Sequence, residues 1–244
     1  MIYKYTKLFP SICKNLEFRF SSPKELNDPF EGHIDYSSIE NIASKMTWEI
    51  EFDKADLLEI AKAGIWFGDI RIFSLSKTCD SPLMWSHYAD RHRGVVIGFN
   101  EADNFFNQDI IYHNESSFPS DKFGKLLPMQ YGKKKIELMD SFKRLPILYK
   151  SEDWIYEQEV RFVLPKESVS SKTKNESGAD IDLFKIPEST LVSIILGANC
   201  DSTDLVRDLQ GLLKRNPRLS HVKIFKAEIN LSYFIIDFKE IILD

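Results

Sequence analysis

Apolar and polar residues alternate between Tyr156 and Leu164, and this alternation predicts a β-strand. One face of the strand carries the apolar residues Val160, Phe162 and Leu164. The other face carries Glu157, Glu159 and Arg161, with Val163 at its far end. Two carboxylates at alternate positions repel each other, so the arrangement requires a neutralising partner or a function.

Two interpretations of this charged face remain open. In the functional one, the carboxylates flank a cleft: one is held ionised by Arg161 or a substrate cation, and the other acts as a general base. In the structural one, Arg161 satisfies both carboxylates on a half-solvated strand, at little net energy.

The same patterns predict further elements along the chain. Predicted strands span Ile2–Tyr5, Leu16–Phe20, Ile70–Ser76, Gly94–Phe99, Ile110–Tyr112, Ile181–Ile186, Leu191–Gly197, Val222–Ile229 and Tyr233–Phe238. Predicted helices or helical turns span Leu8–Asn15, Pro23–Leu26, Ser38–Gly64, Leu83–Asp90, Lys133–Tyr149 and Ser202–Lys214. Ser22 and either Asp80 or Ser81 are expected as N-caps, each before a proline at the first helical position.

This order of elements lacks a regular βαβ alternation. We therefore predict an α+β fold with mixed, mostly antiparallel β-sheets decorated by helices. With 244 residues the chain fits a single domain, 1–244. The polar segment 166–180 is expected to be a mobile loop.

The composition of the chain argues against several classes of function but does not identify one. The net charge of −5 excludes a global electrostatic footprint for nucleic acid, and 10 glycines argue against a glycine-rich nucleotide cradle. Three widely spaced cysteines give no zinc motif and no disulfide framework, so no metal site is expected. The polar N-terminus and the absence of a long apolar run predict a cytoplasmic protein that does not bind membranes.

Three further segments each allow a functional and a structural interpretation. His87 is a general acid or a structural residue at a helix end, and Arg91-His92-Arg93-Gly94 is an anion-binding patch or a solvated turn. Asn27 to Glu31 contacts a ligand or only shapes a turn.

The chain resembles a widespread bacterial family of domains of unknown function. The residues that carry this resemblance are Tyr3-Lys4-Tyr5, Asn27 to Glu31, Ser74 to Ser76, Met84 to Phe99 and Trp154 to Arg161. They span Ile2 to about Gly197. This family resemblance implies no activity.

More distantly, the order of elements is similar to the ADP-ribosyltransferase fold. That fold has an Arg, His or Tyr on its first strand, a Ser-x-Ser strand end and a late Glu-x-Glu. Here these positions fall on Tyr3 or Tyr5, on Ser74-Leu75-Ser76 and on Glu157-Gln158-Glu159. The sequence departs from the family pattern in lacking the first-strand Arg, in having Ser-Leu-Ser for Ser-Thr-Ser, and in placing Arg161 two residues after the proposed catalytic Glu.

The second resemblance implies that NAD is a substrate, that Glu159 is the catalytic carboxylate and that Glu157 positions or deprotonates the acceptor. The residues expected to bind NAD are Tyr3, Tyr5, Ser74, Ser76, His87, Tyr88, Arg91 and Arg93, with Arg19 as an alternative for the pyrophosphate. A fixed anion stabilises the positive charge that develops on the ribose when the glycosidic bond breaks.

Three hypotheses follow. The first is an NAD-dependent ADP-ribosyltransferase or NAD glycohydrolase, of the kind found in bacterial toxins and phage-defence effectors, with a protein or nucleic acid as acceptor. The second is a non-enzymatic ligand-sensing or interaction module that uses the anion-binding patch. The third is a metal-dependent nuclease or phosphodiesterase with Asp28, Glu31, Glu157 and Glu159 around Mg²⁺. The oligomeric state is left open.

Overall fold

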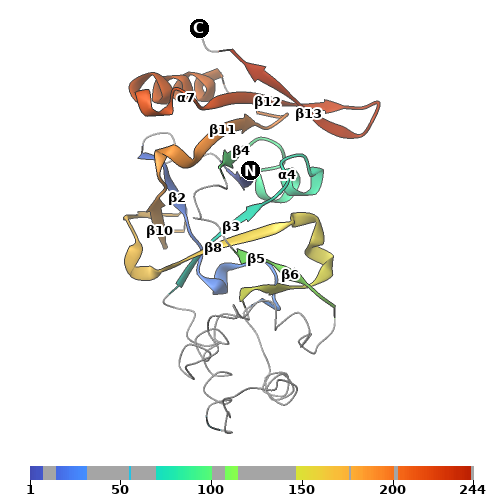
Figure 1. Cartoon of the computed structure of the whole chain (residues 1–244), viewed down its shortest axis with the longest axis vertical. Helices are drawn as coiled ribbons and strands as arrows, with labels where there is room; N and C mark the ends of the chain where they lie inside the picture. Colours follow the sequence, from blue (N-terminus) through green and yellow to red (C-terminus); the bar gives the residue numbers. More distant parts are fainter. Residues whose placement is uncertain are drawn as a thin grey trace.

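The computed structural model describes residues 1–7, 15–31, 55, 70–100, 108–114, 147–175, 177–200 and 203–242. Its main element is an eight-stranded sheet with the order β13-β12-β11-β4-β1-β3-β8-β5 (Figure 1). The bounds of these strands are β1 Ile2–Thr6, β3 Ile70–Ser76, β4 Val95–Phe99, β5 Gln108–Asp109, β8 Glu159–Pro165, β11 Leu191–Leu196, β12 Lys223–Asn230 and β13 Ile235–Ile241.

All neighbours in this sheet are antiparallel except β11 and β12, which are parallel. A parallel pair needs a crossover, and helix α7, Thr203–Arg215, lies in it. The helix buries Leu209, Leu212 and Leu213, which recur at helical spacing. Helix α4, Pro82–Tyr88, precedes β4.

Two smaller sheets accompany the main one. β10, Asp180–Lys185, lies between β2, Glu17–Arg19, and β9, Ser171–Lys174. β6, Ile111–Tyr112, pairs in parallel with β7, Tyr149–Lys150. The short 3-10 helices are η1 Pro23–Glu25, η6 Glu152–Glu157, η7 Lys166–Ser168, η8 Glu188–Thr190 and η9 Pro217–Leu219.

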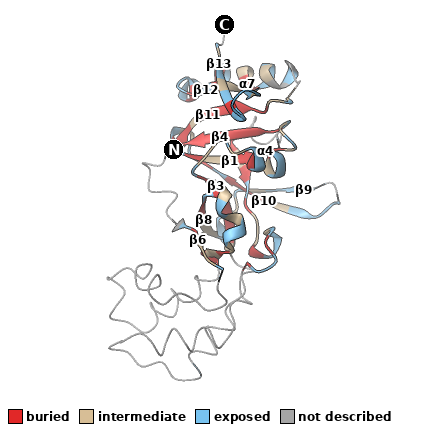
Figure 2. Ribbon diagram, turned by 90° about the vertical axis from the view of Figure 1, so that its right-hand side faces the viewer, coloured by how far each residue is buried: buried red, intermediate tan, exposed pale blue. Residues whose placement is uncertain are grey.

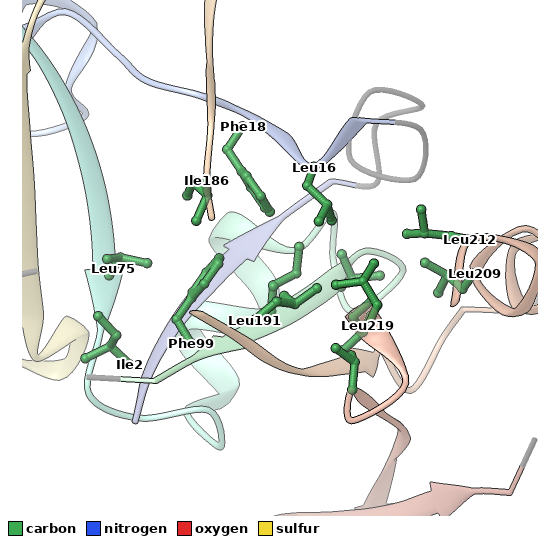
Figure 3. Packing of buried hydrophobic residues seen from close by; sticks show 14 of the residues in the cluster. Ile2, Leu16, Phe18, Leu75, Phe99, Ile186, Leu191, Leu209, Leu212 and Leu219 are labelled. Atoms are coloured by element: carbon green, nitrogen blue, oxygen red, sulfur yellow. The ribbon is translucent and has the colours of Figure 1, made fainter. Parts of the chain in front are cut away.

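The main sheet buries a separate apolar cluster on each face. One face packs against β2, β10 and α7, and Figure 3 shows Phe18, Phe99 and Leu209 among the side chains of this cluster. The other face packs against α4, where Trp85 is fully buried beside Tyr5 and Val96. The central strands are therefore buried, whereas β9 and β13 are largely exposed (Figure 2).

The expected α+β class and the mostly antiparallel pairing are confirmed. The strand at Ile70–Ser76 is found with the predicted bounds, and Ser81 is the N-cap of α4, where its hydroxyl accepts from the Met84 N–H. Ser22 occupies the N-cap of η1, and its N–H donates to Glu25 at 2.8 Å. The helices expected over Leu8–Asn15 and Ser38–Gly64 lie almost entirely outside the described residues.

Two expected elements differ from what forms. The helix predicted to reach Tyr149 is described only at its end, where Tyr149–Lys150 is a strand instead, because Ile111 and Tyr112 offer it a partner. Segment 166–180, expected to be a loop, contains η7 and β9, a strand of four polar residues that pairs antiparallel with β10. Its mobility, and the single domain over 1–244, stay predictions.

In the described part of the chain, neither α-helix has the length and apolar character needed to cross a bilayer. Cys79 and Cys200 are free and half-buried.

Candidate active site: a buried charge cluster beside a pocket

Five ionisable side chains from four separate segments meet on the α4 side of the main sheet. They are Glu31 from the turn after η1, Lys150 from β7, Glu157 from η6, and Glu159 and Arg161 from β8. We call these five residues the charge cluster. All of them are buried, with Arg161 0% exposed.

Glu157 reaches the cluster in a way that the sequence pattern did not predict. Residues 152–157 form η6 rather than the start of the strand, with the Ser151 hydroxyl accepting from the Asp153 N–H. Gln158 then adopts a left-handed conformation, φ 43°, and β8 begins at Glu159. The Ser76 hydroxyl donates to the Glu157 carbonyl at 2.6 Å and fixes this turn. The predicted alternation is therefore wrong for Glu157 and right for Glu159 and Arg161.

Glu159 is held in its ionised form. Arg161 donates from Nε to Oε1 at 2.7 Å and from Nη2 to Oε2 at 2.9 Å. Burial alone raises the pKa of Glu159, but Arg161 and Lys150, with a hydrogen bond from Ser74, lower this pKa to about 2. The carboxylate therefore carries its negative charge across the physiological pH range.

Lys150 lies at the centre of the three carboxylates. Its Nζ is 3.2 Å from Glu31 Oε1, 2.5 Å from Glu157 Oε2 and 3.1 Å from Glu159 Oε2. The ammonium also lies 4.9 Å from the centroid of the Trp154 ring. Burial lowers the pKa of Lys150, but the three carboxylates outweigh it and raise this pKa. Sequence reasoning missed this residue, because a lone Lys after a predicted helix gives no signal.

Glu31 differs from the other two acids of the cluster. Its Oε1 accepts from Arg161 Nη2, whereas its Oε2 is buried without a hydrogen-bond partner. Burial raises the pKa of Glu31, and the opposing effects of Arg161 and Lys150 do not cancel this. Asp28 supports a turn interpretation of Asn27 to Glu31, since its Oδ1 accepts from the Phe30 N–H at 2.9 Å. The segment therefore shapes a turn and also supplies Glu31 to the cluster.

Three of the expected site positions form one row across neighbouring strands. Tyr3 of β1 pairs with Ser76 of β3, and Ser76 pairs with Glu159 of β8. Directly paired residues of antiparallel strands have their side chains on the same face. The row therefore joins three positions that are far apart in the sequence.

Strands β1 and β3 pair only at Tyr3 and Ser76. Beyond this pair the carbonyl of Ser74 accepts instead from Lys4 Nζ, at 2.8 Å. Burial lowers the pKa of Lys4 to about 8, and the nearby Glu159 counteracts part of this effect. A side chain thus takes the place of ladder hydrogen bonds where the two strands separate.

A pocket of about 240 Å³ opens at this separation, beside the charge cluster. All five cluster residues line it, together with Tyr3, Lys4, Tyr5, Arg19, Ser21, Glu25, Leu26, Asn27, Ser74, Leu75, Met84 and Tyr88. The Tyr88 hydroxyl donates to Glu157 Oε1 at 2.5 Å, so both oxygens of Glu157 already accept hydrogen bonds. Burial, followed by the charge of Glu157, raises the pKa of Tyr88.

Of the expected site residues, six line this pocket: Tyr3, Tyr5, Ser74, Tyr88, Glu157 and Glu159. Four do not: Ser76, His87, Arg91 and Arg93. Ser76 is fully buried beneath Glu157, and the exposed His87 lies with Nδ1 3.3 Å from the Tyr156 hydroxyl. Arg19, the alternative expected for the pyrophosphate, lines the pocket and pairs with Glu25 at 2.9 Å.

The basic turn at residues 91–94 connects α4 to β4 and contacts the residues that follow β11. Asp90, Arg91 and His92 all have positive φ, and the carbonyl of His92 accepts from the Asn199 N–H at 2.9 Å. Arg93 pairs with Asp90 at 3.0 Å, and the His92 ring stacks on Trp85. These contacts support the structural interpretation of the turn, although the exposed guanidinium of Arg91 still faces solvent.

No group of three or more metal-ligating side chains suited to a metal ion occurs among the described residues. The ammonium of Lys150 occupies the centre between Glu31, Glu157 and Glu159, where a bound cation would have to lie. The donor set of this cluster thus fits an internal cation better than Mg²⁺.

Comparison with known proteins gives one match. No curated protein and no solved structure matches the chain, and no comparison identifies an ADP-ribosyltransferase. Residues 84–162 match the model of a family described as "Protein of unknown function (DUF2971)". The matched segment runs from α4 to the middle of β8. It includes the pocket residues Tyr88, Lys150, Glu157, Glu159 and Arg161.

Proposed function

We propose that the pocket binds NAD and that the protein breaks the nicotinamide glycosidic bond, as an ADP-ribosyltransferase or an NAD glycohydrolase. The observation that carries the proposal is the row of Tyr3, Ser76 and Glu159 across β1, β3 and β8, with Glu159 ionised beside the pocket. The proposal includes an ADP-ribosyltransferase-like arrangement of the sheet and a cytoplasmic effector role of the toxin or phage-defence kind.

The size and charge of the pocket support a ligand of this type. A volume of about 240 Å³ is small for a whole dinucleotide but accommodates the nicotinamide and its ribose. Four acids and four bases line the pocket, so both the cationic ring and the anionic pyrophosphate find opposite charges. Arg19, whose side chain is 40% exposed, would hold the pyrophosphate at the mouth.

Glu159 supplies a fixed negative charge in this mechanism. The bond between ribose C1′ and the ring nitrogen breaks, the electron pair neutralises the pyridinium, and positive charge develops on the ribose. An anion that Arg161 and Lys150 already orient needs no reorganisation to stabilise that charge. Tyr3 and Tyr5 line the pocket and supply aromatic surface for the nicotinamide riboside, while the Tyr5 hydroxyl donates to the Thr78 carbonyl at 3.1 Å.

Glu31 is better placed than Glu157 to activate the acceptor. Both oxygens of Glu157 accept hydrogen bonds from Tyr88 and Lys150, whereas Oε2 of Glu31 has no partner. Glu31 Oε2 accepts the proton of water or of an acceptor hydroxyl as the oxygen bonds to C1′. The raised pKa of Glu31 favours proton uptake, while the lowered pKa of Glu159 keeps that carboxylate charged.

A second candidate function is a binding module that does no chemistry. This alternative is favoured by the internal contacts of Arg161. Its guanidinium pairs with both Glu159 and Glu31 and donates to the Ile147 carbonyl at 2.5 Å. A cluster whose side chains are already paired in this way could recognise a charged ligand without reacting with it. For a metal-dependent nuclease, no observation on the described residues provides comparable support.

The test measures NAD binding by calorimetry and nicotinamide release by chromatography in wild type, Glu159→Gln and Glu31→Gln. We expect Glu159→Gln to bind NAD and to lose release by about 10²–10³-fold, the usual effect of removing one transition-state contact. Glu167→Gln, an exposed acid beyond the far end of the same strand, serves as the matched control and keeps wild-type release.

Glu31→Gln is expected to lower release by about 10²-fold or more, with binding retained, because a base for the acceptor is removed. Circular dichroism on each variant separates loss of chemistry from loss of fold. Binding by wild type without any release would favour the module, and the absence of both at millimolar NAD would refute the NAD proposal.

A further inference from the structure

The hairpin of β12 and β13 carries an unpartnered sheet edge and an exposed apolar tip. β13 is the last strand of the main sheet, and the described residues supply no strand beyond it. Figure 1 shows this hairpin projecting past the rest of the sheet. At its tip Leu231, Tyr233 and Phe234 are 79%, 75% and 88% exposed. An open edge beside apolar side chains is a template for pairing with another strand.

The charged residues on β13 indicate which charges a partner strand would need. Within the hairpin, Asp237 lies opposite Glu228, and Lys239 lies opposite Lys226. Like charges in direct cross-strand pairs destabilise a sheet. Lys239 makes no ion pair within the described part of the chain, so a partner that brings an acid to Lys239 and a base to Asp237 would relieve both pairs.

We propose that β13 pairs with β13 of a second copy of this chain, antiparallel about a two-fold axis through Phe238. In this register Asp237 lies opposite Lys239 of the second copy, and Lys239 lies opposite its Asp237. Shifting the axis to Asp237 or Lys239 would place like charges opposite each other. The charge pattern therefore selects one isologous register.

The same register covers exposed apolar side chains. Ile235 comes opposite Ile241 of the second copy, and the turn residue Phe234, just before β13, lies at the same end of the paired strands as Ile242 of the second copy. Phe234 and Ile242 are 88% and 84% exposed in one copy, and Ile235 is 48% exposed. Burying such side chains contributes about 25 cal/mol for each Å² of apolar surface. The charge pattern and the apolar pattern, which are independent features, thus agree on one register.

The first experiment uses sedimentation equilibrium on the full chain. We expect wild type to dimerise, and Asp237→Lys or Lys239→Asp alone to weaken the dimer at least tenfold by placing like charges opposite each other. The double variant D237K/K239D restores opposite charges in both pairs and should recover the dimer. Lys185→Glu, a charge reversal at the exposed end of β10 in a separate sheet, is the control that leaves the dimer intact.

A second experiment tests the register. In the double variant I235C/I241C, position 235 of each copy lies directly opposite position 241 of the other copy. Oxidation should therefore give a disulfide-linked dimer. Within one copy these positions are six residues apart along the strand, about 20 Å, so they cannot bond to each other. Each single cysteine variant controls for the native thiols and should give no covalent dimer.

A monomer at all concentrations in wild type would overturn the proposal. A dimer that all the charge variants leave unchanged would also overturn it, because the contact would then lie elsewhere. Circular dichroism of each variant verifies the fold, and the proposal does not depend on the proposed NAD chemistry.

Discussion

At the scale of single residues, Lys150 is the group on which the site depends most. One ammonium pairs with three buried carboxylates, and among the described residues it is the cation that pairs with Glu157. Arg161 offsets a second negative charge through its pairs with Glu31 and Glu159. Since a buried charge without a partner costs several kcal/mol, the two bases make this group of acids possible.

We expect Lys150→Met to lower the free energy of unfolding by about 3–5 kcal/mol, because it leaves buried carboxylates with an uncompensated charge. Urea denaturation measures this. Lys77→Met is the matched control: Lys77 pairs with Asp109 at the surface, so its loss should cost less than about 1 kcal/mol. Equal effects of the two variants would contradict the proposed role of Lys150.

The lowered pKa of Glu159 predicts how its contribution depends on pH. The folded protein holds this pKa at about 2, against an ordinary value of 4.5. The contribution of the carboxylate to stability is therefore complete above about pH 4.5 and is lost as the pH falls toward 2. The raised pKa of Glu31 acts in the opposite direction, so it partly offsets the acid loss in wild type.

Comparing wild type with Glu159→Gln isolates the effect of Glu159. The difference between their free energies of unfolding, measured by urea denaturation, should shrink as the pH falls from 4.5 toward 2. A difference that stays constant over this range would show that Glu159 does not titrate with a lowered pKa.

At the scale of elements, close backbone approaches hold α4 and the ends of β4 and β11 together. The Gly197 N–H donates to the Gly94 carbonyl at 2.9 Å, and a Cβ on Gly197 would lie 2.1 Å from the carbonyl oxygen of His92. The left-handed residues 90–92 bring that carbonyl to β11. The position of Tyr88, at the end of α4, depends on this junction.

Gly197→Ala is accordingly expected to destabilise the fold by about 1–3 kcal/mol, since rigid backbone has to move. Gly211→Ala is the matched control on α7, where a Cβ would meet only the flexible Arg215 side chain at 3.4 Å. This control should stabilise the protein by about 0.5–1 kcal/mol, because alanine loses less backbone entropy in a helix. Thermal denaturation compares the two, and a Gly197→Ala as stable as wild type would argue against a tight junction.

At the scale of the whole molecule, the proposed site and the proposed dimer edge lie in different parts of one sheet. The site involves β1, β3 and β8, while β13 is separated from β1 by β12, β11 and β4. The two features therefore have independent tests, and D237K or K239D should leave nicotinamide release unchanged where it is measured. One eight-stranded sheet would then carry both the proposed site and the proposed dimer edge.

The local elements were largely predictable because they follow from short-range patterns. β3 and the cap of α4 agree with the alternation of Ile70–Ser76 and with Ser81-Pro82. The cluster was predictable only in part: Glu157, Glu159 and Arg161 stood out by spacing, whereas Lys150 did not. Lys150 becomes part of the site only through β7, a strand that exists because Ile111 and Tyr112 pair with it.

The sequence by itself determined most strands of the main sheet, the α4 cap and the face of β8 that carries Glu159 and Arg161, because side-chain alternation and capping act over a few residues. Only the tertiary structure decided that Glu31, Lys150 and Glu157 join them, since these contacts link residues up to 130 positions apart. It also decided which oxygen of Glu31 lacks a partner. That property depends on packing and desolvation, which no local pattern of residues records.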